Sequence, residues 1–267
     1  MFKPARIACR SATLLVAYLG LATILLGACS SPDTSSDEAR AAAPAATSPA
    51  DAAAAPEGAP ATASSTGADT TQVAEGCYYD AEKQPVADPA SLVDFQDPSE
   101  GNADAPVTIV EYFDPNCPHC KTMHEVMKQA VERYGDEAQF VYKPMPLWGF
   151  SVPQIEALYA AAQEGKFIPM LEAQYARQQR GGLSMEQLKE IAREVDMNPD
   201  VLASRVEQNT YRSQIMQQRQ RAIDIGVDST PTVLINGRFV DGRSRTLRCI
   251  GAFIDAAHEN ATTTSSG

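Results

Sequence analysis

Basic residues are scarce in this sequence of 267 residues. It holds 22 Lys and Arg against 34 Asp and Glu, which gives a formal net charge of −12 at pH 7. We find no basic patch that would oppose this acidity. Acidic side chains repel the phosphates of nucleic acids. We therefore expect no nucleic-acid partner.

Close pairs of cysteines are also scarce. Among the six cysteines, Cys117 and Cys120 form a Cys-x-x-Cys pair, whereas Cys77 and Cys249 are isolated. A structural zinc site usually needs a second close pair of ligands. We therefore expect no zinc knuckle, and the single pair needs another explanation.

Long apolar segments are nearly absent, apart from residues 12–26. This segment is short for a stable transmembrane span. It follows a start that carries Lys3, Arg6 and Arg10 without an acidic residue. A basic start, an apolar core and small residues after it are typical of a secretory signal. We predict a signal peptide over residues 1–28, and therefore an exported protein.

The end of this signal, Leu26-Gly27-Ala28-Cys29, resembles the bacterial lipobox. In a lipobox, cleavage precedes the cysteine and the cysteine is lipidated, so Cys29 would be the mature N-terminus and a lipid anchor. An ordinary signal peptide cut nearby, with Cys29 left as a free thiol, is the alternative. Ser30 resembles the outer-membrane sorting pattern of Gram-negative bacteria. We expect a periplasm-facing protein of the bacterial cell envelope, anchored to the outer rather than the inner membrane.

Large apolar residues are almost missing from residues 29–76, which are mostly Ala, Pro, Ser, Thr and Asp. Such a segment cannot bury enough surface to offset its chain entropy. We predict a disordered tether there. Residues 77–102 form a turn-prone, acidic N-terminal extension in which a strand or two could form.

The best-defined motif is Cys117-Pro118-His119-Cys120. Residues 107–113 before it are β-branched and aromatic, as in a buried strand, and residues 121–134 after it place apolar side chains on one helical face. Cys117 is therefore expected at the first turn of a helix. Unpaired N–H groups and the helix macrodipole stabilise an anion at that position.

This position suits disulfide exchange, because thiolate is the nucleophile in that reaction. Cys117 would form a mixed disulfide, Cys120 would resolve it, and protonated His119 would add positive potential. A small structural disulfide is one alternative. Another is a soft-metal site, for instance for copper, in which Cys117, Cys120 and His124 share one helical face.

The motif, placed after a strand that carries Glu111, resembles the DsbA-like branch of the thioredoxin superfamily. A second match lies at residues 226–237, where Thr230-Pro231 opens an apolar run that ends in Asn-Gly, a hairpin turn. Members of the family carry a cis proline at the strand facing the cysteine pair. The resemblance covers residues 101–258 and implies an α/β, thioredoxin fold with an inserted helical domain.

The resemblance also implies the domain boundaries. The thioredoxin-fold domain would comprise residues 103–150 and 222–258, with a helical insertion at residues 151–221 that covers the active site and shapes a groove for unfolded substrate. The final helix is expected over residues 247–258, and residues 259–267 would be a flexible tail.

Roles for further residues follow from the resemblance. The alternation of the strand could point Glu111 towards the core beneath Cys117, where burial would raise its pKa. In the family, a buried acid at the matching position assists proton movement; a solvent-exposed strand residue is the alternative. Lys143 could pair with it. Thr230 would lie beside the sulfur of Cys117, and the backbone at Pro231 would pair with an extended peptide if the bond is cis; an ordinary trans proline is the alternative.

The other cysteines suggest a second disulfide. With Cys9 removed and Cys29 lipidated, an even number of thiols is left, which invites pairing in an exported protein. If the motif cysteines form the redox pair, Cys77 and Cys249 can clip the ends of the domain together. Two unpaired buried thiols, or a second exchange site, are the alternatives.

We predict an exported, lipid-anchored thiol–disulfide oxidoreductase that acts on secreted or periplasmic proteins. A stabilised thiolate stabilises the reduced form, which favours an oxidant over a reductase or isomerase. The expected partners are reduced or unfolded proteins. The resemblance also implies a quinone-linked membrane thiol oxidase of the DsbB or VKOR type. No cofactor is expected, and metal binding is the less favoured alternative.

Overall fold

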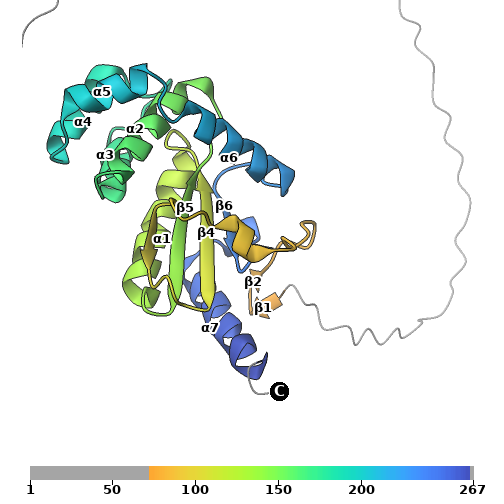
Figure 1. Cartoon of the computed structure of the whole chain (residues 1–267). Coiled ribbons are helices and arrows are strands. Elements are labelled where there is room, and N and C mark those ends of the chain that lie inside the picture. The colour runs from red at the N-terminus through yellow and green to blue at the C-terminus, as the bar shows by residue number, and fades with distance from the viewer. Residues whose placement is uncertain (1–71, 265–267) are drawn as a thin grey trace, which may run out of the picture. The chain divides into compact units, whose positions relative to one another are not determined.

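The computed structural model describes residues 72–264 (Figure 1). The predicted signal peptide, Cys29 and most of the predicted tether lie outside the described residues. Within the described part, no helix combines the length and the apolar character that a membrane crossing requires.

The centre of the fold is a strand–helix–strand unit. Strand β4 (Val107–Phe113) leads into helix α1 (Pro118–Tyr134), and the chain returns as strand β5 (Ala138–Pro144). β4 and β5 pair in parallel, as the crossover through α1 requires. The strand and helix predicted on either side of the cysteine motif are confirmed, and they place the motif at the end of the central strand.

Three shorter strands complete a five-stranded sheet of order β3-β5-β4-β6-β7. β6 (Thr232–Ile235) pairs antiparallel with β4, and β7 (Arg238–Phe239) follows it through the predicted Asn-Gly turn. The turn residues Asn236 and Gly237 both have positive φ, which such a two-residue turn requires. β3 (Ser99–Gly101) pairs antiparallel with β5 at the other edge.

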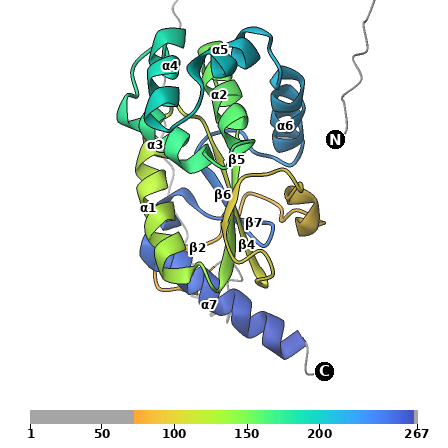
Figure 2. The same ribbon diagram turned by 60° about the vertical axis from the view of Figure 1, so that its left-hand side comes forward.

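Five helices lie together at the end of the sheet where β4 stops, and Figure 2 shows them as one group. They are α2 (Val152–Ala162), α3 (Phe167–Ala176), α4 (Met185–Glu194), α5 (Pro199–Glu207) and α6 (Arg212–Asp224). Ser184 and Gln187 form a capping box at the start of α4. The predicted helical insertion is therefore in place, although α6 extends past its boundary at residue 221.

The two faces of the sheet bury alternate residues of β4. Ile109 and Phe113 belong to a core that includes α1 and helix α7 (Leu247–Thr264), whereas Val110 and Tyr112 belong to a second core on the other face. This alternation is the period of two that a strand imposes. The alternation therefore determines which side chains of β4 lie on the face of the sheet that carries the cysteine pair.

The N-terminal part of the domain differs from the prediction. β1 (Gln72–Ala74) pairs with β2 (Cys77–Tyr78), so ordered structure begins inside the segment predicted as tether to residue 76. Val73 and Ala74 pack against the main core, which explains the order. The extension also supplies β3, and it is therefore part of the fold.

The C-terminal helix is also longer than predicted. α7 continues to Thr264, through much of the segment that was expected to be a flexible tail. Cys249 on this helix forms a disulfide with Cys77 on β2, with an S–S distance of 2.10 Å. The clip between the two ends of the domain, suggested by the number of cysteines, is thus present in the structure.

Candidate active site

Cys117 and Cys120 lie where β4 meets α1. Cys117 is the N-cap of α1 and Pro118 follows at the start of the helix. The backbone N–H groups of Cys120 and Lys121 donate to the carbonyl of Cys117, at 3.1 and 3.2 Å. Both cysteines are free thiols, and both are buried. The predicted placement of Cys117 at a helix N-terminus is confirmed.

The surroundings of Cys117 stabilise its thiolate. A hydrogen bond from the Cys120 thiol contributes most, and it lowers the pKa of Cys117 to about 5 together with the backbone N–H of Cys120, the Thr230 side chain and the backbone N–H of His119. Burial acts in the opposite direction. The contribution of His119 thus comes from its backbone N–H, while its imidazole is exposed to solvent.

Cys120 has the opposite character. Its complete burial raises its pKa far above that of free cysteine, and the hydrogen bond to Cys117 and the nearby Glu111 raise it further. At neutral pH, Cys120 is therefore a thiol beside the thiolate of Cys117. The pair divides chemically into a reactive sulfur and a protonated one.

Glu111 lies on β4, on the same face of the sheet as the cysteine pair. It is 2% exposed and stands opposite Tyr142 on β5 and Val233 on β6. Its Oε1 atom has no hydrogen-bond partner within the described structure. Burial raises the pKa of Glu111 to about 8, the charge of Arg245 opposes this rise, and Cys117 adds to it. The buried position predicted for Glu111 is confirmed.

The predicted pairing of Lys143 with Glu111 is wrong. Lys143 is adjacent to Tyr112 in the strand register, one position beyond the pair formed by Glu111 and Tyr142. Successive side chains point to opposite faces of a sheet, so Lys143 lies on the other face. There it forms ion pairs with Asp97 and, at 3.3 Å, with Asp94.

The loop before β6 closes over the sulfur of Cys117. The Thr230–Pro231 bond is cis, and the Thr230 carbonyl oxygen lies 3.4 Å from Cys117 Sγ. The predicted position of Thr230 beside the sulfur is confirmed.

Asp114 organises the loop before Cys117, a role that the sequence alone does not predict. Its buried carboxylate accepts hydrogen bonds from Asn116 N (2.7 Å), Leu147 N (2.6 Å) and Ser151 Oγ (2.9 Å). The Asp-Pro-Asn sequence is a signal for a turn of this kind. The partners at residues 147 and 151 have no such local signal, because they come from the start of the helical insertion.

Gln178, just beyond α3, also contacts the active-site loop. Its Nε2 donates to the carbonyls of Pro115 and Cys117, at 3.0 and 3.1 Å. Because Gln178 belongs to the helical insertion, the reactive loop is held from both parts of the domain. Sequence alone offers no pattern that identifies this residue.

A pocket of about 420 Å³ opens between the insertion and the cysteine motif. Trp148 and Phe150 form one side of it, with stacked rings 5.5 Å apart and exposures of 41% and 40%. The pocket is lined by Asn116, Pro118, Trp148, Phe150, Gln178, Gln179, Arg180 and Gly181. It corresponds to a groove of the kind predicted between the insertion and the active site.

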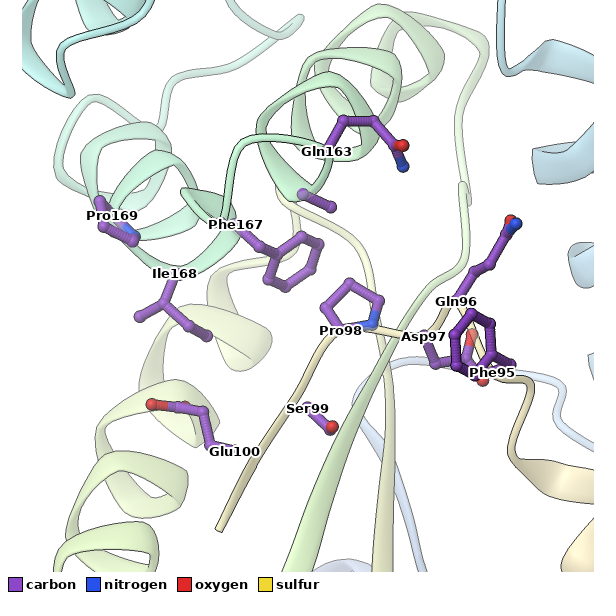
Figure 3. A pocket seen from close by; sticks show the side chains of 12 residues that line it. Phe95, Gln96, Asp97, Pro98, Ser99, Glu100, Gln163, Phe167, Ile168 and Pro169 are labelled. Atoms are coloured by element: carbon purple, nitrogen blue, oxygen red, sulfur yellow. The ribbon is translucent and has the colours of Figure 1, made fainter. Parts of the chain in front are cut away.

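A larger pocket, of about 690 Å³, lies away from the cysteines (Figure 3). The segment from Phe95 to Glu100 forms one side, and Phe167 and Ile168 form the other. Its two acidic side chains are already engaged, Asp97 with Lys143 and Glu100 with the Tyr142 hydroxyl at 2.7 Å. The reactive groups therefore lie at Cys117 and not in this pocket.

The alternative metal site is not assembled. His124 is buried on α1, but its Nε2 lies 3.7 Å from Glu172 and its ring packs at a tilt against Tyr175, with centroids 5.4 Å apart and an interplanar angle of 46°. Over residues 72–264, no three His, Cys, Asp or Glu side chains gather in an arrangement that could hold a metal ion. The set of Cys117, Cys120 and His124 is thus not brought together as a ligand group.

Comparisons with known proteins agree on the fold. Residues 95–256 match the family described as Thioredoxin. A thioredoxin-like oxidoreductase from Silicibacter pomeroyi DSS-3 is 26% identical, with a TM-score of 0.57, and the match covers 65% of this chain and 98% of that one. BdbD from Bacillus subtilis (20% identity, TM-score 0.57, 66% and 96% covered) and DsbA from Chlamydia trachomatis (18%, 0.56, 62% and 94%) share the fold.

The similar proteins of curated sequence are Na⁺/H⁺ antiporters. NhaA 3 of Salinispora tropica is 29% identical over 146 residues, which are 54% of this chain and 22% of the antiporter. NhaA of Herminiimonas arsenicoxydans is 26% identical over 163 residues, 61% of this chain and 26% of that protein. The chain thus spans about a quarter of the length of these relatives, and the match does not carry antiport activity to it.

Proposed function

This chain belongs to the thioredoxin family and has the fold of the DsbA-like thiol–disulfide oxidoreductases, and from that premise we propose that it exchanges disulfides with secreted or periplasmic proteins through Cys117 and Cys120. The observation that carries the proposal is the difference in pKa between the two cysteines, lowered at Cys117 and raised at Cys120. A thiolate-stabilised sulfur at a helix N-terminus stands beside a buried, protonated one.

The oxidising reaction needs only these groups. A substrate thiolate attacks Cys117 in the Cys117–Cys120 disulfide, which forms a mixed disulfide and releases the sulfur of Cys120. Glu111, an acid with a pKa of about 8, can give that sulfur its proton. A second substrate thiolate then attacks the substrate sulfur of the mixed disulfide, which forms the substrate disulfide and releases Cys117 as a thiolate.

The low pKa of Cys117 supports the oxidising direction. A sulfur that ionises easily is a good leaving group, and its thiolate stabilises the reduced enzyme relative to the disulfide form. In the reductase or isomerase direction, Cys117 would attack a substrate disulfide and Cys120 would have to lose its proton before it resolves the intermediate. Burial of Cys120 disfavours that ionisation.

The loop at Thr230 and Pro231 supports a role in substrate binding. It lies against the sulfur that would be bonded to the substrate, so a substrate chain at Cys117 must pass beside it. We assign to its backbone the pairing with an extended peptide, in the manner of an added strand. The pocket beside Trp148 and Phe150 would take neighbouring apolar side chains of a reduced or unfolded protein.

The location and the redox partner are part of the same proposal. The signal-like start and the lipobox at Cys29 support an exported protein anchored to the outer membrane and facing the periplasm. An oxidant must be reoxidised after each turnover. A quinone-linked membrane thiol oxidase of the DsbB or VKOR type would do this, as the family resemblance implies.

The first test measures whether the oxidised protein oxidises a reduced dithiol peptide. The second measures which cysteine variants form a mixed disulfide with the peptide. Offered the same peptide in its disulfide form, Cys120→Ser should accumulate a mixed disulfide between Cys117 and the peptide by exchange, visible by mass spectrometry, whereas Cys117→Ser should form none. Equilibration of the wild-type pair with glutathione gives the direction. A Cys117→Ser variant that still oxidises the peptide would overturn the proposal.

A further inference from the structure

Arg245 links the loop before β6 to the end of β7. It follows the short helix η3 (Gly242–Ser244), and its Nη1 donates to the carbonyl of Pro231. Its Nε and Nη2 both lie 3.4 Å from the carbonyl of Val240. The guanidinium therefore joins the loop that carries the cis peptide bond to the rigid part of the sheet.

The segment that carries Arg245 is itself held firmly. The N–H of Tyr78 donates to Ser244 Oγ at 2.9 Å, and the N–H of Asp241 donates to the carbonyl of Tyr78 at 3.1 Å. The disulfide between Cys77 and Cys249 fastens the same two segments a few residues away. The backbone that carries Arg245 is therefore fixed by hydrogen bonds and a nearby disulfide, as a residue that positions others requires.

Arg245 also brings a positive charge to the buried acid. The positive charge of Arg245 opposes the rise that burial causes in the pKa of Glu111. In return, Cys120 and Glu111 oppose the lowering of the pKa of Arg245 by burial. The ionisable groups that interact electrostatically with Glu111 are Arg245 beside η3, Cys117 and Cys120 at the start of α1, Tyr142 on β5 and Tyr175 on α3. Within this set, Arg245 supplies the cationic group.

We propose that Arg245 is a positioning residue of the exchange site, whose guanidinium holds the Pro231 carbonyl and so keeps Thr230 against the sulfur of Cys117. The inference rests on the proposed function of that sulfur. A second consequence follows from its charge, which favours the carboxylate form of Glu111. Arg245 acts through these neighbours and takes no part in the bond exchange itself.

Three substitutions separate the two effects. Arg245→Met removes both the donors and the charge, Arg245→Gln keeps a donor for the Pro231 carbonyl without the charge, and Arg245→Lys keeps the charge. Arg243→Met is the matched control, because Arg243 lies in the same segment but its side chain is 86% exposed and pairs with Asp241 at the surface. All variants are compared with the wild-type full chain by circular dichroism to establish that they fold.

The first readout is the ultraviolet absorbance of the Cys117 thiolate during titration of the reduced protein. The wild type should titrate near pH 5, and Arg245→Met should titrate at higher pH because the side chain of Thr230, one of the groups that lower the pKa of Cys117, is no longer held beside the sulfur. Arg245→Gln, which keeps a donor, should stay closer to the wild type. Arg243→Met should match the wild type.

The second readout is the pH profile of peptide oxidation. Loss of the Arg245 charge should move the limb near pH 8 that reports Glu111 to higher pH in both Arg245→Met and Arg245→Gln, but not in Arg245→Lys. For Arg245→Met, kcat/KM should also fall by about tenfold to a hundredfold, with a higher KM, because the loop that would bind the peptide is misplaced.

The inference is wrong if folded Arg245→Met keeps the thiolate titration, the pH limb and the KM of the wild type. Should Arg245→Met fail to fold, the same comparison of Arg245→Gln and Arg245→Lys with the wild type decides the matter. Failure of the proposed function looks different, because the wild type itself would then oxidise no peptide, while the titrations would still report whether Arg245 positions the loop.

Discussion

The carbonyl oxygen of Thr230 lies 3.4 Å from the sulfur of Cys117, although 113 residues separate the two in the chain. The contact joins the two halves of the thioredoxin-fold domain on either side of the helical insertion. It places a backbone segment that can pair with a peptide directly beside the sulfur that would bond to that peptide.

The ionisation of Cys117 should make the reduced protein gain stability with pH. Its pKa of about 5 in the folded state lies below its ordinary value of 9.0, so the stabilisation is complete above about pH 9 and is lost as the pH falls towards 5. The disulfide form has neither free thiol, whereas Glu111 is present in both forms. Cys120, whose pKa is raised by burial, opposes the gain only near and above pH 9, where the unfolded thiol ionises. Urea unfolding across this range should therefore show that, as the pH rises, the free energy of unfolding of the reduced form increases relative to that of the oxidised form. A constant difference, or one that reverses sign, would contradict the prediction, and the Cys117→Ala protein should lack the gain in stability that the reduced wild type shows between pH 5 and pH 9.

The Cys77–Cys249 disulfide should contribute stability without taking part in exchange. It closes a loop with a sequence separation of 172, and both cysteines are buried on the side of the domain formed by β2 and α7. Replacing both by serine should lower the free energy of unfolding by about 2–5 kcal/mol. The folded double variant should still form the mixed disulfide through Cys117. Loss of exchange in a variant that remains folded would assign the second pair a redox role.

Asp114 should stabilise the active-site loop. Asp114→Ala leaves the N–H groups of Asn116 and Leu147 and the hydroxyl of Ser151 without their acceptor, and should cost about 2–4 kcal/mol in the free energy of unfolding. Asp114→Asn keeps an acceptor oxygen and should cost less. Urea unfolding of both variants measures the effect, with Asp88→Ala, at an exposed helix cap, as the control. An equal, small loss for all three would show that the network is unimportant.

The aromatic pair beside the cysteines should matter for binding more than for stability. Trp148 and Phe150 are partly exposed, so Trp148→Ala and Phe150→Ala should each change the free energy of unfolding by less than about 1 kcal/mol. The KM for a reduced peptide with apolar residues near its cysteine should rise, while that for a polar peptide should not. Phe95→Ala, at a fully exposed side chain of the distant pocket, serves as the control. A KM unchanged for both peptides would exclude the pocket as a substrate site.

Much of the site was predictable because its signals are local. The β-branched run before Cys117 and the helical period after it placed the sulfur at a helix N-terminus, and the structure has Cys117 as the N-cap. The strand period also put Glu111 inside the sheet. The Thr-Pro pair before an apolar run and an Asn-Gly turn located the loop over the sulfur, through the family resemblance. Counting cysteines identified Cys77 and Cys249 as candidates for a clip.

The identity of the reactive pair and the local conformation around it follow from the order of residues along the chain, because helix caps, strand periods and turns depend on neighbours in the chain. Tertiary structure alone decided the partners. The strand register put Lys143 on the face opposite Glu111, and the return of the chain after β7 brought Arg245 to the Pro231 carbonyl. These contacts join segments far apart in sequence, and no local pattern encodes which of several charged side chains arrives at a buried acid.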